Sequence, residues 1–372
     1  MHFIFQVTFG CNFKCLHCFA DAKEGAPQIS LEDAVVLMNK IPSDSEVVFH
    51  GGEPTLLGVD FYVNLIERCP QHRYSMQTNL YLFDDRWARF AVEYMNGRVS
   101  SSFDPYLPSS LKLRPFSKKD FYERILLLRK YGIRPYIIST FWRGNQDVTP
   151  EGWFKIFKEA GVNFRINFIE KLGRAALNYD KYRPDKGKYA KLLIGIFDLW
   201  FLKEREIIVD PLAEILLHFL SGNSTFKCPF SSDCANYIAC ISFDGNVYPC
   251  GGFNFPEFRY GNLLKESFEK VFSSPKRLEA IKRKFMLPEK CKKCPYFSIC
   301  QGGCRLEAYG YYKDIYMHTS LCEEYRLIFR HIEKRIERES LSVVTEWLSE
   351  LELGSRLGER GKKKEKKEME GR

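Results

Sequence analysis

Short apolar segments alternate with amphipathic ones over the first 170 residues, and this alternation limits the folds open to the chain more than any other feature. The short segments are rich in β-branched and aromatic residues, and roughly 10–15 residues of helical periodicity separate them, which is typical of βαβ units. The strands are expected at 2–9, 46–50, 74–79, 98–104, 134–142 and 163–169. Such connections are right-handed and give a parallel sheet. Six units predict a barrel or partial barrel over 1–170, with its chemistry at the carboxyl ends of the strands.

The rest of the chain divides into four parts. Residues 171–227 have helical periodicity and are expected to bridge to 228–325, where glycine, proline and cysteine dominate and long periodicity is absent. A segment of this composition builds little apolar core, so metal links are expected to order it. An amphipathic helix is predicted over 326–353, and a lysine-rich tail follows over 354–372.

Charge and hydropathy exclude some functions. The formal net charge is +9, of which the tail supplies +4 through eight basic and four acidic side chains, so the remaining +5 is weak evidence for nucleic-acid binding. The tail has no aromatic residues between its lysines, which favours a solvated segment over an anchor for an acidic partner. No run of 18 apolar residues is present to span a membrane. The N-terminus lacks the features of a signal peptide, so a cytoplasmic protein is expected.

The 13 cysteines indicate metal or redox chemistry, because a chain this long without a signal peptide is not a disulfide framework. Cys11, Cys15 and Cys18 form a C-x3-C-x2-C motif directly after the first expected strand. A structural zinc site uses four protein ligands, and a [4Fe–4S] cluster also takes four, usually cysteines. Three close cysteines without an obvious fourth leave one coordination position open for a substrate or cofactor.

The stretch CNFKCLHC at 11–18 resembles the cluster motif of the radical S-adenosylmethionine (SAM) enzymes. The resemblance implies that Cys11, Cys15 and Cys18 bind a [4Fe–4S] cluster whose fourth iron chelates the amino and carboxylate groups of SAM. Reductive cleavage of SAM would give a 5′-deoxyadenosyl radical that abstracts hydrogen from a substrate. His17 stands where the family usually has an aromatic residue, and its planar ring could still pack near adenine. The family fold is a partial (β/α)6 barrel, in agreement with the six units above.

A second motif, HGGEPTL at 50–56, ends the second expected strand. Taken alone, it is an ordinary turn signal. After the cysteine motif, it resembles the GGEP motif of the same family, which contacts the methionine ammonium of SAM. The resemblance implies that Gly51 and Gly52 allow close backbone approach and that Glu53 is the anionic partner of the ammonium group. Pro54 completes the motif.

Further contacts to SAM are expected at the ends of later strands. The resemblance implies polar contacts to the ribose and carboxylate of SAM from Asn79, Ser102, Asp104, Ser139 and Arg165. Alternatives stay open from the residues alone, with Asn79 and Asp104 as loop caps and Arg165 as a surface cation. Asp104 is in addition a candidate catalytic residue.

The nine cysteines from 228 to 322 include CKKCPYFSICQGGC, a C-x2-C-x5-C-x3-C run at 291–304. Two zinc sites are one interpretation, since C-x2-C is common in them. The run, together with the G-x4-C stretch at 245–250, resembles instead the SPASM extension of peptide- and protein-modifying radical SAM enzymes, which holds two auxiliary [4Fe–4S] clusters. The resemblance implies a distal cluster on Cys291, Cys294, Cys300 and Cys322. It implies a proximal cluster on Cys228, Cys234, Cys250 and Cys304.

Two cysteines remain. Cys240 lies in the strand-like stretch YIACISF and is expected to be a buried thiol, although it could replace Cys228 or Cys234 as a ligand. Cys69 ends a helical segment and is not expected to bind metal. With full cysteine ligation, both auxiliary clusters would serve electron transfer rather than substrate coordination.

The substrate is not written in these motifs. The chain begins almost at the first expected strand, so no leader-peptide-binding domain is expected, and a peptide would be delivered by a separate binding protein unless a folded protein is the substrate. The first prediction is oxidative modification of a peptide or protein by thioether or carbon–carbon crosslinking or by epimerisation, with a ferredoxin or flavodoxin as reductant. Maturation of a metalloenzyme or its cofactor, such as a tungsten oxidoreductase, is an alternative, and a non-catalytic iron–sulfur or zinc scaffold is another.

One subgroup of the family can be examined at a single position. Anaerobic sulfatase maturases place a catalytic aspartate directly after the cysteine of the YPC stretch, whereas here Gly251 follows Cys250. Formylglycine formation by the same base is therefore not expected, unless Asp104 or Asp233 takes that part. Clusters of this kind are oxygen-sensitive, so activity is expected only under anaerobic conditions.

Overall fold

The computed structural model describes residues 1–107, 113–221, 228–232 and 234–350, so Asp233 and the lysine-rich tail lie outside the described residues. A ten-stranded sheet in the order β10–β9–β8–β1–β2–β3–β4–β5–β6–β7 forms its centre. The strands are β1 (His2–Thr8), β2 (Glu46–Gly51), β3 (Arg73–Gln77), β4 (Val99–Ser102), β5 (Tyr136–Phe141), β6 (Asn163–Phe168), β7 (Val209–Asp210), β8 (Ile238–Ser242), β9 (Asn246–Tyr248) and β10 (Gly261–Asn262). From β1 to β7 neighbouring strands pair in parallel, which confirms the predicted α/β class.

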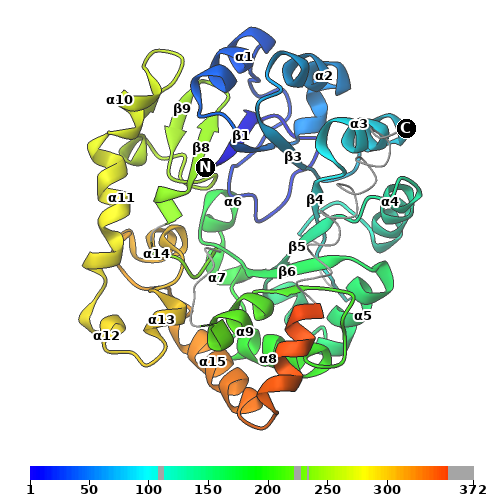
Figure 1. The fold of residues 1–372 in the computed structure, drawn as a ribbon, viewed down its shortest axis with the longest axis vertical. Coiled ribbons are helices and arrows are strands. Elements are labelled where there is room, and N and C mark those ends of the chain that lie inside the picture. The colour runs from blue at the N-terminus through cyan, green and yellow to red at the C-terminus, as the bar shows by residue number, and fades with distance from the viewer. Residues whose placement is uncertain (108–112, 222–227, 233, 351–372) are drawn as a thin grey trace.

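Helices surround the strands, as Figure 1 shows for α1 to α5. The helices are α1 (Leu31–Lys40), α2 (Val59–Arg68), α3 (Asp85–Met95), α4 (Lys118–Lys130), α5 (Pro150–Ala160), α6 (Gly173–Ala176), α7 (Tyr179–Tyr182), α8 (Lys188–Trp200), α9 (Leu212–Ser221), α10 (Phe268–Phe272), α11 (Pro275–Met286), α12 (Glu289–Lys292), α13 (Phe297–Cys300), α14 (Arg305–Tyr312) and α15 (Cys322–Ile336). Ser30 caps the start of α1, because its side chain accepts a hydrogen bond from the backbone N–H of Asp33.

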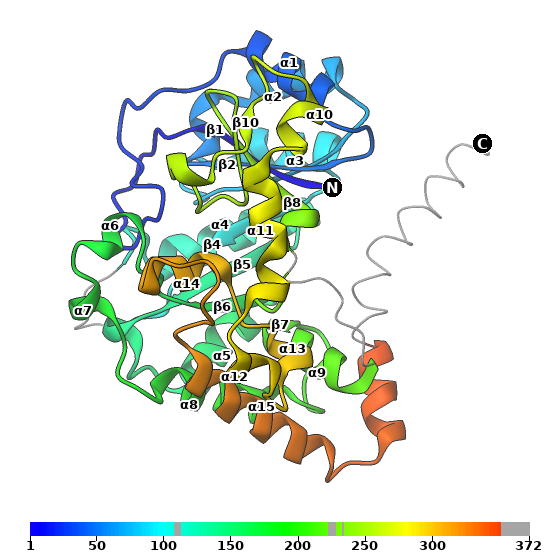
Figure 2. The ribbon, with the colours of Figure 1, turned by 90° about the vertical axis from the view of Figure 1, so that its left-hand side faces the viewer.

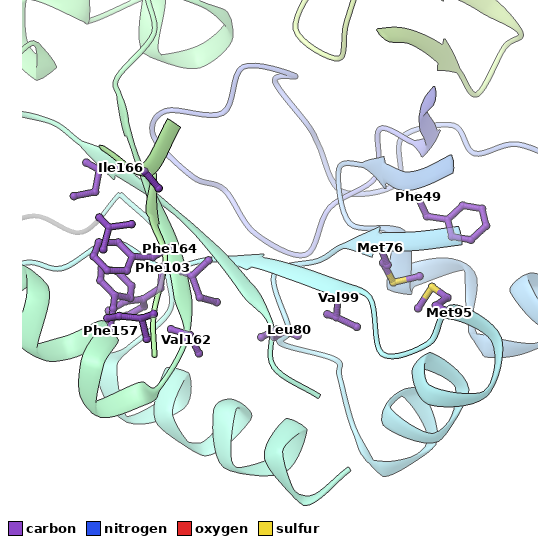
Figure 3. Packing of buried hydrophobic residues seen from close by; sticks show 14 of the residues in the cluster. Phe49, Met76, Leu80, Met95, Val99, Phe103, Phe157, Val162, Phe164 and Ile166 are labelled. Carbon is purple, nitrogen blue, oxygen red and sulfur yellow. The ribbon is translucent and has the colours of Figure 1, made fainter. Parts of the chain in front are cut away.

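Each strand has one side that packs on the helices. Phe49 of β2 stacks on Tyr74 of β3 with ring centroids 5.2 Å apart and meets Tyr62 of α2 at 4.7 Å. Met76 and Val99 continue this layer beside α3, as Figure 3 shows. Burying such side chains contributes roughly 1.5–3 kcal/mol each, so this layer fixes the register of the barrel strands.

The other side of the same strands is polar. Successive residues of a strand point to opposite faces, so Gln6, His50, Gln77, Ser102 and Arg165 share the side away from the helices. Gln6 is fully buried, and Gln77 Nε2 donates to Ser102 Oγ at 3.1 Å. A polar layer inside the sheet is a surface that can hold a polar ligand.

The cysteine-rich part joins the same sheet. Strand β8 pairs in parallel with β1, so that His2 lies opposite Ile238, and β9 returns antiparallel to β8. Figure 1 shows β8 and β9 beside β1. The expectation that 228–325 lacks long periodicity was wrong, because α11 runs through 12 residues of it. The sequence of α11 is dominated by lysine and arginine, so the periodicity of its few apolar residues is hard to detect.

The predicted single helix over 326–353 is also wrong. Helix α15 ends at Ile336, and the backbone becomes helical again over 341–350 (Figure 2). Ser340 starts the second helix, since its Oγ accepts from Val343 N at 3.4 Å and its carbonyl accepts from Val344 N at 3.2 Å. A capping serine between two amphipathic stretches ends one helix and starts the next.

Candidate functional site

Residues 9–29, the cysteine loop, follow β1 at the carboxyl edge of the sheet. Phe13 N donates to Cys11 Sγ at 3.3 Å, and Ala22 N donates to Cys18 Sγ at 3.4 Å. Burial raises the pKa of Cys11 to about 12 and that of Cys15 to about 11, and nearby thiols act in the same direction. The loop therefore gathers three thiols and supplies N–H groups to two of the sulfurs, as sulfur ligands of iron–sulfur clusters require.

Arg174 of α6, which the sequence analysis did not single out, holds this loop in place by hydrogen bonds. Arg174 of α6 donates through Nη1 to the carbonyl of Cys15 at 2.6 Å and through Nη2 to that of Ala22 at 2.7 Å. Its backbone N–H donates to the carbonyl of Cys18 at 2.9 Å. The preceding Gly173 has φ +47°, and a Cβ there would lie 2.3 Å from the Cys18 carbonyl oxygen. The Gly173–Arg174 pair was visible in the sequence only as a Gly-Arg dipeptide.

Gly51 and Gly52 bring the end of β2 against the cysteine loop. Gly51 has φ +136°, and a Cβ on it would stand 2.1 Å from the Thr8 carbonyl oxygen. Gly52 N donates to the same oxygen at 2.8 Å. The close approach that these glycines permit is thus an approach of the chain to itself, which was not part of the expectation from sequence.

Glu53 is a buried carboxylate held by neutral donors. Thr55 and Thr78 donate to its Oε1 through their hydroxyls, each at 2.6 Å, and Asn79 N donates to Oε2 at 2.7 Å. Burial raises the pKa of Glu53, although these hydrogen bonds oppose the rise. Within the described part of the chain, no lysine, arginine or histidine lies within 4.0 Å of the carboxylate. An anion that is 1% exposed and lacks a cation fits an external ammonium group.

Asp104 is committed to an ion pair. Its Oδ2 accepts from Arg114 Nε at 2.6 Å, and its Oδ1 accepts from Thr140 N at 2.6 Å. The charge of Arg114 also acts on Cys15, where it opposes the rise in thiol pKa. With both oxygens engaged, Asp104 is better placed to hold Arg114 beside the cysteine loop than to accept a proton.

The remaining predicted contacts separate by strand face. Arg165 is on the polar side and donates to Asn167 Oδ1 at 3.0 Å and to Glu214 Oε1 at 3.3 Å, so it is a partly buried, ion-paired cation. Ser139 lies on the helix-facing side, fully buried, next to residues of the apolar core. A direct contact of Ser139 with a ligand inside the barrel is therefore not supported by its position.

His17 belongs to the cysteine loop, and Asn79 contacts the loop from the end of β3. Asn79 Nδ2 donates to Asn12 Oδ1 at 2.8 Å, while its Oδ1 caps the following turn at Tyr81 N. Burial, together with Arg114 and Arg174, lowers the pKa of His17 well below its usual value, so the ring is neutral. Its buried Nδ1 has no hydrogen-bond partner in the described structure. His17 can therefore offer a nitrogen to a bound ligand.

The four cysteines of the distal set line one cavity of about 570 Å³. Two of them belong to the short helices α12 and α13, and Cys322 begins α15. Burial raises the pKa of Cys300 to about 12, and Cys322, Cys291 and Cys294 contribute to the rise. The set expected from the sequence is thus gathered in one place.

The proximal set is gathered between η3 (Cys234–Asn236), β9 and α14. A hydrogen bond with Cys228, together with burial, raises the pKa of Cys304 well above its usual value. Burial and then Cys304 raise the pKa of Cys250, and Cys234 adds to the rise. Cys304 therefore lies near Cys228 and Cys250, although it directly follows the distal run in the sequence.

The sulfur sets are not arranged for single ions. Among the residues that the structure describes, no group of three or more His, Cys, Asp or Glu side chains is placed to hold one metal ion. A zinc site requires its ligands to meet at one point, whereas each cysteine of a [4Fe–4S] cluster binds a different iron. Four sulfur donors can hold either zinc or a [4Fe–4S] cluster, so the donor set alone does not choose between them.

Cys69 lies apart from these sets, whereas Cys240 is near Cys250, whose charge adds to the effect of burial in raising the pKa of Cys240. Cys240 lies within β8, fully buried, opposite Ile4 of β1 and Tyr248 of β9. Cys69 is the C-cap of α2, fully buried, with Val35 O 3.9 Å from its Sγ. Both have the surroundings of packed core thiols.

Comparison with known families decides what this arrangement is. The Radical SAM superfamily pattern matches residues 5–157, and an iron-sulfur cluster-binding domain of the SPASM type matches residues 233–295. The chain therefore carries a radical SAM domain followed by a SPASM domain. The first match contains the cysteine loop and Glu53, and the second contains Cys234, Cys250, Cys291 and Cys294. The two domains confirm the cofactors expected from the sequence, which are SAM and [4Fe–4S] clusters.

The relatives of this radical SAM enzyme include maturases. It is 29% identical over 323 residues to a cysteine-type anaerobic sulfatase-maturating enzyme of Clostridium perfringens, covering 80% of this chain and 86% of the relative. It is 23% identical over 364 residues to a serine-type anaerobic sulfatase-maturating enzyme of Bacteroides thetaiotaomicron, with 87% and 86% covered. A structure of anSMEcpe with bound AdoMet and the Cp18Cys peptide shares its fold, with TM-score 0.76, 24% identity and coverage of 91% and 98%. No helix among the described residues is long and apolar enough to cross a membrane.

Proposed function

We propose that this radical SAM enzyme modifies a side chain of a peptide or protein by hydrogen abstraction. The observation that carries the proposal is the position of Glu53, a buried carboxylate without a cation, at the strand edge where three thiols are gathered. Glu53 N donates to the carbonyl of Gly10 at 2.8 Å, so the carboxylate and the cysteine loop form one unit. The relatives that act on sulfatases support a peptide or protein as substrate.

The residues of the chain have separate tasks in this proposal. Cys11, Cys15 and Cys18 would hold the N-terminal cluster, and Glu53 would bind the ammonium group of SAM. Bound there, a reduced cluster would supply the electron for reductive cleavage of SAM, the chemistry that allows hydrogen abstraction from the substrate. Arg174 keeps the loop in place, and burial together with the charges of Arg114 and Arg174 keeps His17 neutral. The buried donors around Glu53 orient its carboxylate before SAM arrives, which lowers the cost of binding.

The auxiliary sets would hold two further clusters. Each has four cysteines, so neither leaves an open position for substrate, and electron transfer is the task that such ligation permits. Gln6 links this part to the barrel, because its Nε2 donates to the Gly251 carbonyl at 2.8 Å and its Oε1 accepts from Asn254 at 3.0 Å. A ferredoxin or flavodoxin would be the reductant, and a separate peptide-binding protein would deliver a short substrate.

Anaerobic reconstitution tests the proposal. Protein loaded with iron and sulfide, reduced with dithionite and supplied with SAM, is expected to release 5′-deoxyadenosine, and Cys11→Ala is expected to abolish the release. Cys69→Ala is the matched control, because it removes a buried thiol outside the cysteine loop, and its product yield should equal that of the wild type. A fully iron-loaded wild type that releases no 5′-deoxyadenosine overturns the proposal.

A second candidate is oxidation of a cysteine or serine to formylglycine, which the similarity to the two maturases favours. Against it stands Gly251, at the position where the resemblance implies a catalytic aspartate. A Cβ at Gly251 would meet only ordinary contacts, with Ile4 side-chain carbons at 3.4 and 3.6 Å and Gln6 Nε2 at 3.7 Å. The position therefore has room for a Cβ atom, the first requirement for a side chain there.

The variant Gly251→Asp separates the two candidates. If the chain is a crosslinking or epimerising enzyme, neither form should convert the cysteine of a sulfatase peptide, as measured by mass spectrometry. Formylglycine produced by the wild type would establish the second candidate. Formylglycine produced only by Gly251→Asp would show that the barrel accepts such peptides and that the base is what it lacks.

A further inference from the structure

Two arginines are buried next to the auxiliary cysteines. Arg283 of α11 is 0% exposed, and Arg305, the first residue of α14, is 3% exposed. In the described part of the chain, no carboxylate lies within 4.0 Å of either guanidinium. Buried arginines are normally paired with acids, so these two require another source of negative charge.

The contacts of Arg283 are with backbone carbonyls. Its Nε donates to Ile315 O at 2.6 Å, and its Nη2 donates to Met317 O at 3.0 Å and to Gly302 O at 3.2 Å. Its Nη1 is buried and has no hydrogen-bond partner in the described structure. Carbonyl dipoles fix the guanidinium plane but do not neutralise its charge.

Arg305 reaches the proximal set directly. Its Nη2 donates to Cys234 Sγ at 2.6 Å, and its Nη1 donates to Ala280 O at 3.2 Å. Its Nε has no partner among the described residues. A guanidinium bonded to a sulfur compensates a thiolate, because the hydrogen bond is stronger when the acceptor is charged.

Arg283 lies within electrostatic range of both sets. Burial and the nearby Arg305 lower the pKa of Arg283, whereas the thiolates of Cys304, Cys234 and Cys300 raise it. Cys304 and Cys234 belong to the proximal set, and Cys300 belongs to the distal set. Two like charges buried side by side are strongly unfavourable unless an anion lies between or beside them.

We propose that Arg283 and Arg305 are the shared counter-charge of the two auxiliary cysteine sets and set the reduction potential of the clusters held there. The inference rests on the proposed cysteine ligation. Four thiolates make each set anionic, and one-electron reduction adds a further negative charge. A fixed neighbouring cation stabilises the reduced form more than the oxidised form and thereby raises the potential. Both arginines act through the cysteine sulfurs, so they are positioning residues rather than catalytic ones.

Potentiometric titration followed by electron paramagnetic resonance tests the inference. The triple variant Cys11→Ala, Cys15→Ala, Cys18→Ala removes the N-terminal set, so that the spectra report only the auxiliary sets. In this background Arg283→Met is expected to lower the equilibrium constant for reduction of an auxiliary cluster at least tenfold. For a one-electron reduction this is a shift of the midpoint potential of about 59 mV to more negative values. Arg283→Lys is expected to restore most of the shift, because it keeps the charge and loses only the planar hydrogen bonds.

The control is Arg277→Met on the same helix. Arg277 donates to Phe272 O at 3.1 Å and lies over the Phe272 ring, so its loss should leave both midpoints unchanged. Equal potentials in wild type and Arg283→Met, or equal shifts in the Met and Lys variants, would overturn the inference. If Arg283→Met does not fold, Arg305→Met is titrated against Arg305→Lys with the same expected pattern.

Iron analysis keeps this inference separate from the proposed ligation. The triple variant should retain about eight iron atoms, as two [4Fe–4S] clusters require. A lower content with loss of the auxiliary spectra would contradict the cysteine assignment itself. Full iron with unmoved potentials would contradict only the assignment of the arginines.

Discussion

Gly52 lies against Gly10 so closely that a Cβ atom on Gly52 would stand 2.0 Å from the Gly10 carbonyl oxygen. The same oxygen accepts the backbone N–H of Glu53 at 2.8 Å. One carbonyl of the cysteine loop thus lies against Gly52 and holds the backbone of Glu53 in the second motif. The two motifs behave as a single structural unit, although α1 and β2 separate them in the chain.

This relationship predicts that Gly52→Ala damages the site. The added methyl group has to move the Gly10 backbone, and overpacking of this kind costs about 1–3 kcal/mol. We expect lower stability, loss of iron from the cysteine loop and loss of 5′-deoxyadenosine release. Gly152→Ala on α5 is the control, since a Cβ there meets only Val148 at 3.3 Å and Thr149 at 3.4 Å. A Gly52→Ala protein with full iron and normal turnover would show that the loop can move.

Glu53→Gln should weaken SAM binding without unfolding the protein. The amide keeps the shape of the side chain and removes the charge that would face the ammonium group. A hydrogen bond to a charged group contributes roughly 1.5–3 kcal/mol, so we expect a loss of affinity of roughly 10- to 100-fold. Calorimetry with SAM on the iron-loaded protein measures it. Unchanged affinity would remove Glu53 from the SAM site.

The stability of the SAM-free protein should depend on pH through the same residue. Burial raises the pKa of Glu53 above 4.5, so the folded state holds its proton more tightly than the unfolded state does. Its contribution to stability is therefore complete below about pH 4.5 and is lost as the pH rises through the folded pKa. Stability curves of wild type and Glu53→Gln should diverge over this window, with the wild type losing stability relative to the variant. Parallel curves would contradict the assignment.

The sequence predicted most of this barrel because each strand has a clear apolar side and each helix a boundary signal. Ser30 and Asp33 show how local such signals are. The partners of the polar side were harder to foresee, since Gln6 depends on Gly251 and Arg174 depends on the carbonyls of Cys15 and Ala22. Contacts between residues far apart in the chain do not produce a periodic pattern in the sequence, so they cannot be predicted from it in this way.

Ser139 and α11 show two other limits. Ser139 stands at the predicted strand but on its helix-facing side, and one residue of register decides which side a strand residue takes. In α11, lysines and arginines obscure the apolar side, of which Ala280 and Arg283 are the buried members. A buried arginine is not expected from composition, because burial of a charge becomes reasonable only once the thiols around it are known.

The cysteine assignment predicts different iron contents for two variants. Cys250→Ala should lose about four iron atoms and the proximal signal, because Cys250 lies with Cys304 and Cys234. Cys240→Ala should keep all of the iron, since Cys240 is fully buried in β8 and paired with β1 and β9. Iron content and paramagnetic spectra after reconstitution measure both. Loss of iron from Cys240→Ala would make that residue a ligand in place of Cys228 or Cys234.

The helix over 341–350 should stabilise the barrel through its buried side chains, of which Trp347 is the largest. Trp347 is 1% exposed, with its ring centroid 4.8 Å from Trp200 and 5.4 Å from Phe201 of the α8 end. Trp347→Ala leaves a cavity there and should cost about 3–5 kcal/mol, seen as a lower denaturation midpoint by circular dichroism. Leu341→Ala, at a position that is 68% exposed, is the control and should change the midpoint little. Equal denaturation midpoints for the two variants would mean that the packing of Trp347 does not stabilise the barrel.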